Sequence, residues 1–136
     1  MSDDFGEPVS VNTDPTLPHD RAAEEAVLGA VLIDPESYFE VSQVIRPDDF
    51  YIIRNRWIWE VFQHLNERRT PIDYLTVLNE LEQRGHLLDC GGSAYVTSLI
   101  NQTPTALHAV SYAHIIEQTA LRRRMLTAAN EMAKMA

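Results

Sequence analysis

Apolar side chains recur at helical spacing through most of the chain, which predicts a succession of helices. Residues 1–18 precede this pattern and hold prolines and acidic residues without periodicity, so we expect a disordered tail there. Order is expected to begin near Asp20, whose carboxylate can cap the first helix. Glu24 and Glu25 follow in its first turn, where negative charge suits the helix dipole. Gly29 lies inside this helix and, since glycine weakens helices, indicates close packing against a neighbour.

Proline and charged residues mark the next boundaries. Asp34 followed by Pro35 predicts a helix start, with the aspartate as cap and the proline at the first helical position. That helix is expected to run through Ile45. The adjacent carboxylates Asp48 and Asp49 then predict a turn with capping duty. Acid–base catalysis is the weaker interpretation, because it needs carboxyls held in different environments.

A third helix, which carries Trp57 to Leu65, and a fourth helix, which carries Leu78 and Leu81, are expected to form the centre of the core. Asp73 is the expected cap of the fourth helix and Gly85 its left-handed stop. A fifth helix should follow Gly91 and Gly92. The apolar faces of the two central helices predict that six side chains are buried together: Trp57, Val61, Phe62, Leu65, Leu78 and Leu81. The fold class predicted by residues 19–105 is therefore an all-α head of about five or six helices.

The last segment, 106–136, contains neither proline nor glycine and predicts one long helix. Leu121, Met125, Ala128 and Met132 alternate steps of four and three, which is typical of a coiled-coil seam. Packing of this helix on its own domain is the alternative that so short a pattern leaves open. The pattern continues to the last residue without a cap, which is typical of a helix cut within its length.

Composition narrows the classes of function. The chain has 136 residues, 45% of them hydrophobic, which suits one domain with a real core. Lys and Arg number 11 against 20 Asp and Glu, for a net charge of −9, and such a chain repels phosphates. Arg122, Arg123 and Arg124 form the one basic run. Consecutive helical positions do not share a face, so a solvated flank is expected, with contact to an acidic partner as the alternative.

No motif in the sequence supplies catalysis. There is no Gly-rich loop ending in Lys-Ser/Thr for a nucleotide, and the histidines lack the spacing of metal ligands. His64 is expected to pair with Glu60 on a helix surface, and Cys90 to be an unreactive loop cysteine. The chain has no signal peptide and no apolar run of about 20 residues, so we expect a cytoplasmic, non-catalytic protein without metal or cofactor.

Several short motifs follow one another in a definite order: Pro18-His19-Asp20, Ala23 to Ala30, Asp49-Phe50-Tyr51, Ile58-Trp59, Pro71-Ile72-Asp73, Gly91-Gly92 and Thr103-Pro104-Thr105-Ala106. In order and spacing they resemble the N-terminal domain of bacterial replicative DNA helicases of the DnaB type. The resemblance covers residues 18–136. Asn55 stands where the family suggests His, and His108 stands where it commonly has Asn.

The resemblance implies that this chain is one domain of a larger protein that forms a ring assembly. Proteins of this kind are hexameric ring helicases that use ATP and Mg²⁺ in a C-terminal RecA-like domain, which this chain lacks. Their N-terminal domain is a helical head with a helical hairpin, of which 106–136 would be the truncated first arm. Paired between subunits, these domains form a collar, a trimer of dimers, that docks primase and in some cases a helicase loader. DNA is bound by the full ring rather than by this domain.

Two other classes compete with this interpretation. A small helix-turn-helix DNA-binding regulator fits short helices joined by tight turns, but the net charge and the lack of a basic recognition helix oppose it. A metal-free helical enzyme lacks any catalytic constellation. Salt-dependent DNA binding would favour the regulator, and self-association without DNA affinity would favour the collar domain.

Overall fold

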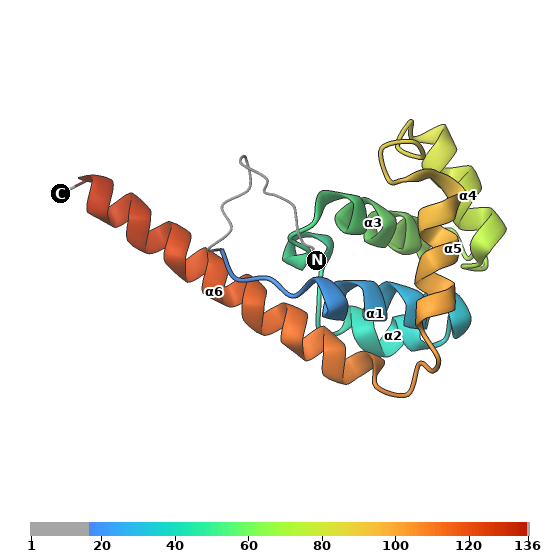
Figure 1. Cartoon of the computed structure of the whole chain (residues 1–136), viewed down its shortest axis with the longest axis horizontal. Helices are drawn as coiled ribbons and strands as arrows, with labels where there is room; N and C mark the ends of the chain where they lie inside the picture. The colour runs from blue at the N-terminus through green and yellow to red at the C-terminus, as the bar shows by residue number, and fades with distance from the viewer. Residues whose placement is uncertain (1–16, 136) are drawn as a thin grey trace, which may run out of the picture.

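The computed structural model describes residues 17–135, and over that range every regular element is a helix, which confirms the predicted all-α class. The predicted tail lies outside the described residues except for Leu17 and Pro18. A head of short helices is followed by one long helix that projects from it (Figure 1). In chain order the elements are α1 (Arg21–Ile33), α2 (Ser37–Ser42), the short 3₁₀ helix η1 (Pro47–Asp49), α3 (Ile53–Glu67), α4 (Tyr74–Gln83), α5 (Gly92–Gln102) and α6 (Ala109–Met135).

Capping side chains set several of these boundaries as predicted. The carboxylate of Asp20 accepts a hydrogen bond from the backbone N–H of Ala23 at 2.9 Å and starts α1. Asp73 and Thr76 bond each other's backbone N–H groups at 2.9 Å, which starts α4. Gly85, with a φ of 77°, ends that helix in the left-handed conformation.

Two helices begin later than predicted. The backbone carbonyl of Asp34, rather than its carboxylate, accepts the N–H of Ser37 at 2.9 Å. A turn therefore precedes α2, which starts at Ser37 and ends at Ser42, short of the predicted Ile45. The hydroxyl of Thr105 accepts the N–H of Leu107 at 3.1 Å within a loop, and α6 starts only at Ala109. At Asp34 successive backbone turn bonds lead into the helix, whereas at Thr105 the side-chain turn bond competes with the first helical turn.

The core is centred on α3, although not on every residue predicted for it. Val61, Phe62, Leu65 and Leu81 are buried, whereas Trp57 and Leu78 are only partly buried. Trp59 occupies the centre instead, with its ring 5.1 Å from Tyr38, 5.6 Å from Phe50 and 5.7 Å from Phe62 between centroids. Trp57 lies about 140° around the helix from Phe62, since each residue turns about 100°. It stacks on His86 at 4.0 Å, at the edge of the head.

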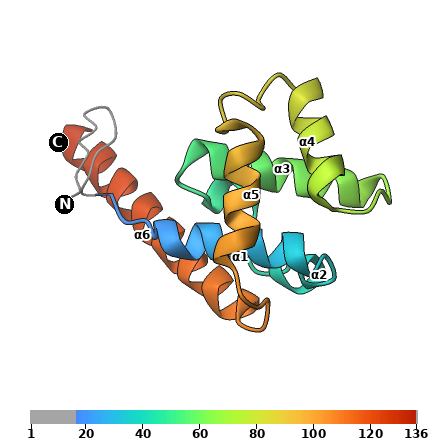
Figure 2. The same ribbon diagram turned by 45° about the vertical axis from the view of Figure 1, so that its right-hand side comes forward.

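The first half of α6 belongs to the same core. Ala109, Ala113, Ile116 and Ala120 are all buried. Small side chains at helical spacing let α6 lie close alongside α1, as the second view shows (Figure 2). The predicted head, 19–105, thus does not contain the whole core, because α6 closes one side of it.

Gly29 marks the close helix crossing that the sequence predicted. A Cβ atom built there would overlap the side chain of Thr103 and the carbonyl oxygen of Leu99. The missing side chain therefore lets the backbone of α1 touch the end of α5.

Gly29→Ala is expected to lower the free energy of unfolding by about 1–3 kcal/mol, because the methyl group overpacks the crossing. Chemical denaturation measures this. The control, Ala22→Gly on the exposed side of α1, should cost about 1 kcal/mol from helix propensity alone. If Gly29→Ala stabilised the chain, as helix propensity by itself predicts, the close crossing would be disproved.

Candidate interaction surface on the last helix

The second half of α6 leaves the head. After Ala120 no residue of the described helix is buried. The predicted seam lies on this free part: Leu121 is 52% exposed, Met125 62% and Met132 70%, and Ala128 is also exposed. The head therefore leaves this apolar stripe uncovered. The structure holds a single chain, so the interface role of the seam stays a prediction.

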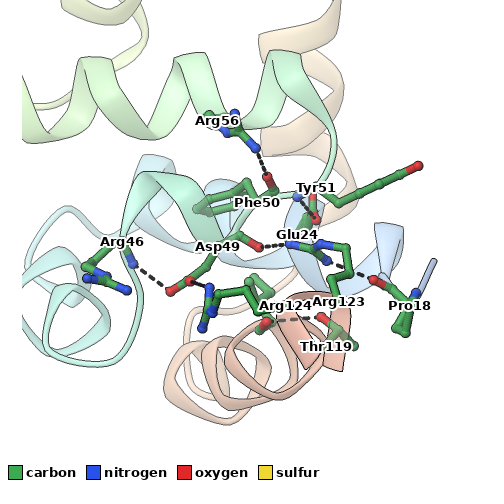
Figure 3. A network of polar contacts seen from close by, with 11 residues as sticks. Pro18, Glu24, Arg46, Asp49, Phe50, Tyr51, Arg56, Thr119, Arg123 and Arg124 are labelled. Carbon is green, nitrogen blue, oxygen red and sulfur yellow. Dashed lines mark hydrogen bonds and ion pairs between the residues drawn. The ribbon is translucent and has the colours of Figure 1, made fainter. Parts of the chain in front are cut away.

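Arg123 fastens α6 to the head where the two separate (Figure 3). Its guanidinium donates to the backbone carbonyl of Pro18 at 2.8 Å and to that of Asp49 at 2.7 Å. It also lies over the ring of Tyr51, with its Cζ 5.1 Å from the centroid. One side chain of α6 thus joins the segment before α1 to the end of η1.

Arg124 makes the second contact. Its Nη1 lies 3.0 Å from Oδ1 of Asp49. The other carboxylate oxygen of Asp49 accepts the N–H of Arg46 at 3.0 Å, which confirms the predicted capping role of this aspartate. Asp49 is 3% exposed, and its buried charge is compensated by the guanidinium of Arg124 and by the backbone N–H of Arg46.

The arginine run therefore differs from the solvated flank that was expected, with partner contact as the alternative. Arg123 and Arg124 bind the head, because both lie near the side of α6 that carries Ile116 and Ala120. Arg122, one position earlier, is turned away and exposed. Of the three, Arg122 keeps its predicted availability to a partner.

Glu24 is a buried carboxylate, although its sequence position predicted only a favourable interaction with the dipole of α1. It is 1% exposed and caps the start of α3 from another helix. Its Oε2 accepts the N–H of Tyr51 at 2.8 Å, and its Oε1 accepts the N–H of Ile52 at 3.3 Å and the side-chain amide of Asn55 at 3.0 Å. Burial raises the pKa of Glu24, against the hydrogen bonds and the charge of Arg123, which lower it. Glu25 is partly buried, with its side chain 15% exposed, and pairs at 3.1 Å with Arg21, whose side chain is exposed.

Asn55 extends this buried network. Fully buried, it accepts a hydrogen bond from the hydroxyl of Tyr95, while Arg54 lies 3.8 Å over the Tyr95 ring. Asn55, where the sequence departs from the family pattern, thus stabilises the core through buried hydrogen bonds. The other departure, His108, is exposed and meets Tyr112 edge-on at 6.4 Å.

The sequence held one signal of this network. Glu24 shares a helical face with Val27, Leu28 and Val31, all of them buried. An acidic residue on such an apolar face has to find donors inside the fold. Which donors it finds depends on α3 and α6, which are distant in sequence, and no pattern along the chain indicated Asn55, Asp49 or Arg123 as partners.

Two other residues that were considered for chemistry, His64 and Cys90, have structural surroundings in the fold. His64 lies 3.7 Å from Glu80, not beside Glu60 as predicted, because α4 packs along α3. Cys90 is buried, and burial raises the pKa of its thiol to about 11, which opposes reactivity. Within residues 17–135 there is no cluster of three or more His, Cys, Asp or Glu placed to hold a metal ion. No helix in that range is long and apolar enough to cross a membrane.

Comparison with known proteins identifies the fold family. Residues 16–118 match the DnaB-like helicase N terminal domain. The chain belongs to this family. The predicted resemblance is confirmed, and the alternative of a DNA-binding regulator loses its support. Replicative DNA helicase DnaB of Haemophilus influenzae is 33% identical over 117 residues, which are 86% of this chain and 25% of that protein. Replicative DNA helicase DnaC of Bacillus subtilis is 36% identical over 117 residues, 86% of this chain and 26% of that protein.

The chain thus spans about a quarter of the length of these curated relatives, and its family match is to the N-terminal domain. The crystal structure of the N-terminal domain of DnaB helicase from Mycobacterium tuberculosis superposes with a TM-score of 0.85 at 36% identity, covering 88% of this chain and 85% of that one. The N-terminal domain of DnaB helicase from Helicobacter pylori, described together with its interactions with primase, gives 0.73 at 20% identity, covering 83% and 88%. The second likeness shows a shared fold.

Proposed function

We propose that this chain is the N-terminal collar domain of a hexameric replicative DNA helicase, where it joins subunits and docks primase. The observation that carries the proposal is the division of α6 into two parts. The first half is built into the core of the head, and the second half presents an uncovered apolar seam. A domain of this family with such an arm is suited to assembly.

The clamp between α6 and the head supports this role. Arg123 and Arg124 hold the helix where it leaves the core, so the seam points in a fixed direction relative to the head. An arm fixed in advance loses less conformational freedom when it pairs with another subunit. Preorganisation of this kind is what a collar of repeated contacts requires.

The proposal extends to the intact protein. There the collar would be a trimer of dimers in the cytoplasm that also meets primase and a helicase loader. DNA would be held by the ring, and ATP with Mg²⁺ would be used by a C-terminal RecA-like motor. Arg122 is a candidate contact to a partner because it is the arginine of the run that faces away from the head.

Leu121→Asp with Met125→Asp is expected to abolish weak self-association of this chain. Burying a Leu or Met side chain contributes about 1.5–3 kcal/mol, and association costs at least several kcal/mol in rigid-body freedom. We therefore expect an affinity of roughly micromolar or poorer for the unchanged chain. Sedimentation over about a hundredfold concentration range measures it, and circular dichroism checks that the exposed substitutions leave the fold intact.

Asn130→Asp with Ala133→Asp is the matched control. These two residues are also exposed on the distal part of α6, but they lie on another side of the helix and add a comparable negative charge. The control should associate as the unchanged chain does. Monomers at every concentration for the unchanged chain, or equal association of the seam variant, would rule out the seam as a self-association interface.

A further inference from the structure

A second surface lies on the side of the head away from the distal seam. It is a groove of about 690 Å³ between the C-terminal end of α1, the start of α2 and the loop that leads into α6. Its apolar lining includes Ile33, which is 39% exposed, and Leu107, which is 80% exposed. An exposed leucine in a loop contributes nothing to the core, so this side chain is available for contact.

Carboxylates line the same groove. Asp34, Glu36 and Glu40 are all lining residues, and all three are exposed. None of them forms an ion pair with another described residue. The two stretches of chain that build the groove lie within 22–45 and 85–121, and neither contains a Lys or an Arg. The groove therefore combines apolar surface with negative charge that no neighbouring cation along these stretches compensates.

We propose that this groove binds a cationic amphipathic helix of a partner protein. Leucine-like side chains of such a helix would cover Ile33 and Leu107, and its Lys or Arg side chains would meet Glu36 and Glu40, which lie one helical turn apart. A nucleic acid carries the wrong charge for this surface. The inference rests on the docking half of the proposed function, and it places that docking on the head rather than on the seam of α6.

The test uses the complete chain and a synthetic amphipathic peptide of about 18 residues, with leucines on one face and lysines beside them. Amide shifts in nuclear magnetic resonance spectra should move at 33–40 and 105–110 when the peptide is added. Glu36→Gln with Glu40→Gln is expected to weaken binding about fivefold, because two exposed ion pairs are lost. Leu107→Asn should weaken it about tenfold through lost apolar burial. A peptide with lysines replaced by glutamates should not bind.

Glu82→Gln with Asp89→Asn is the matched control, since it removes the same charge from exposed positions on α4 and the loop after it. It should change the dissociation constant less than twofold. Equal weakening by both pairs would mean that the peptide follows net charge, and this would reject the groove. Sedimentation of the Glu36→Gln, Glu40→Gln variant addresses a second copy as the occupant: loss of self-association in that variant would also overturn the proposal. The two proposals can fail separately. If the seam substitutions abolish self-association but the groove substitutions leave peptide binding unchanged, the collar function is supported and only the groove proposal is rejected.

Discussion

Trp59→Ala is expected to lower the free energy of unfolding by about 3–5 kcal/mol. The indole is 1% exposed and touches three other rings, those of Tyr38, Phe50 and Phe62, which come from α2, from the residue after η1 and from α3 itself. Its removal loses the transfer free energy of a large side chain and leaves a cavity where these elements meet. Since a small domain has only about 5–15 kcal/mol of stability, much of it would be lost. Urea denaturation followed by circular dichroism measures the change.

Trp57→Ala provides the matched control on the same helix. This indole is only partly buried and stacks on His86 at the edge of the head. The same substitution there should cost about 1–2 kcal/mol, because less apolar area leaves water on folding. The apolar pattern along the chain assigned Trp57 to the core. An equal or larger loss for Trp57→Ala would favour that sequence-based assignment over the structure.

Glu24→Ala is expected to destabilise the fold by about 3–5 kcal/mol, because it leaves buried groups without their charged partner. The backbone N–H groups of Tyr51 and Ile52 and the amide of Asn55 would lose their acceptor, and Arg123 would lose a nearby negative charge. Alanine is the best helix former, so the loss cannot come from the helix propensity of α1, and the charge of Glu24 in the first turn accounts for only about 0.3–1 kcal/mol of it. Chemical denaturation at neutral pH gives the free energy.

Glu25→Ala removes the same side chain from the next position of α1. Glu25 is partly buried but pairs with the exposed guanidinium of Arg21, and such a solvent-accessible ion pair contributes about 0–1 kcal/mol, so the control should stay near that range. Similar losses for the two variants would show that Glu24 does not cap α3.

The effect of Glu24 should depend on pH. Its pKa is raised on folding, so the folded chain holds this proton more tightly than the unfolded chain does. The stability linked to this proton is fully present below the ordinary pKa of 4.5 and is lost as the pH rises through the folded value. Alanine takes up no proton. The difference between the unchanged chain and Glu24→Ala is therefore expected to be larger at about pH 5 than at about pH 7, and a difference that shrinks on acidification would contradict the raised pKa.

Local chemistry along the chain was sufficient to predict much of the fold. The caps at Asp20 and Asp73, the left-handed stop at Gly85 and the close packing at Gly29 were all predicted correctly. Each depends on residues within a few positions or on a backbone property of one residue, and sequence displays such information directly. The helical spacing of the apolar residues was likewise enough to predict the all-α class.

Tertiary structure alone decided which side chains pair across the fold. Trp59 rather than Trp57 fills the core, because the surrounding rings of Tyr38 and Phe50 come from other elements. Glu24 caps α3, and Arg123 reaches Pro18 across more than 100 residues of chain. These contacts depend on how α1, α3 and α6 are placed in space, which no periodicity along one helix contains. The sequence by itself determined the helices and the apolar stripe of α6. The packing determined that this stripe remains uncovered, because the buried alanines hold only the first half of α6 against the head and the arginine contacts end at Arg124.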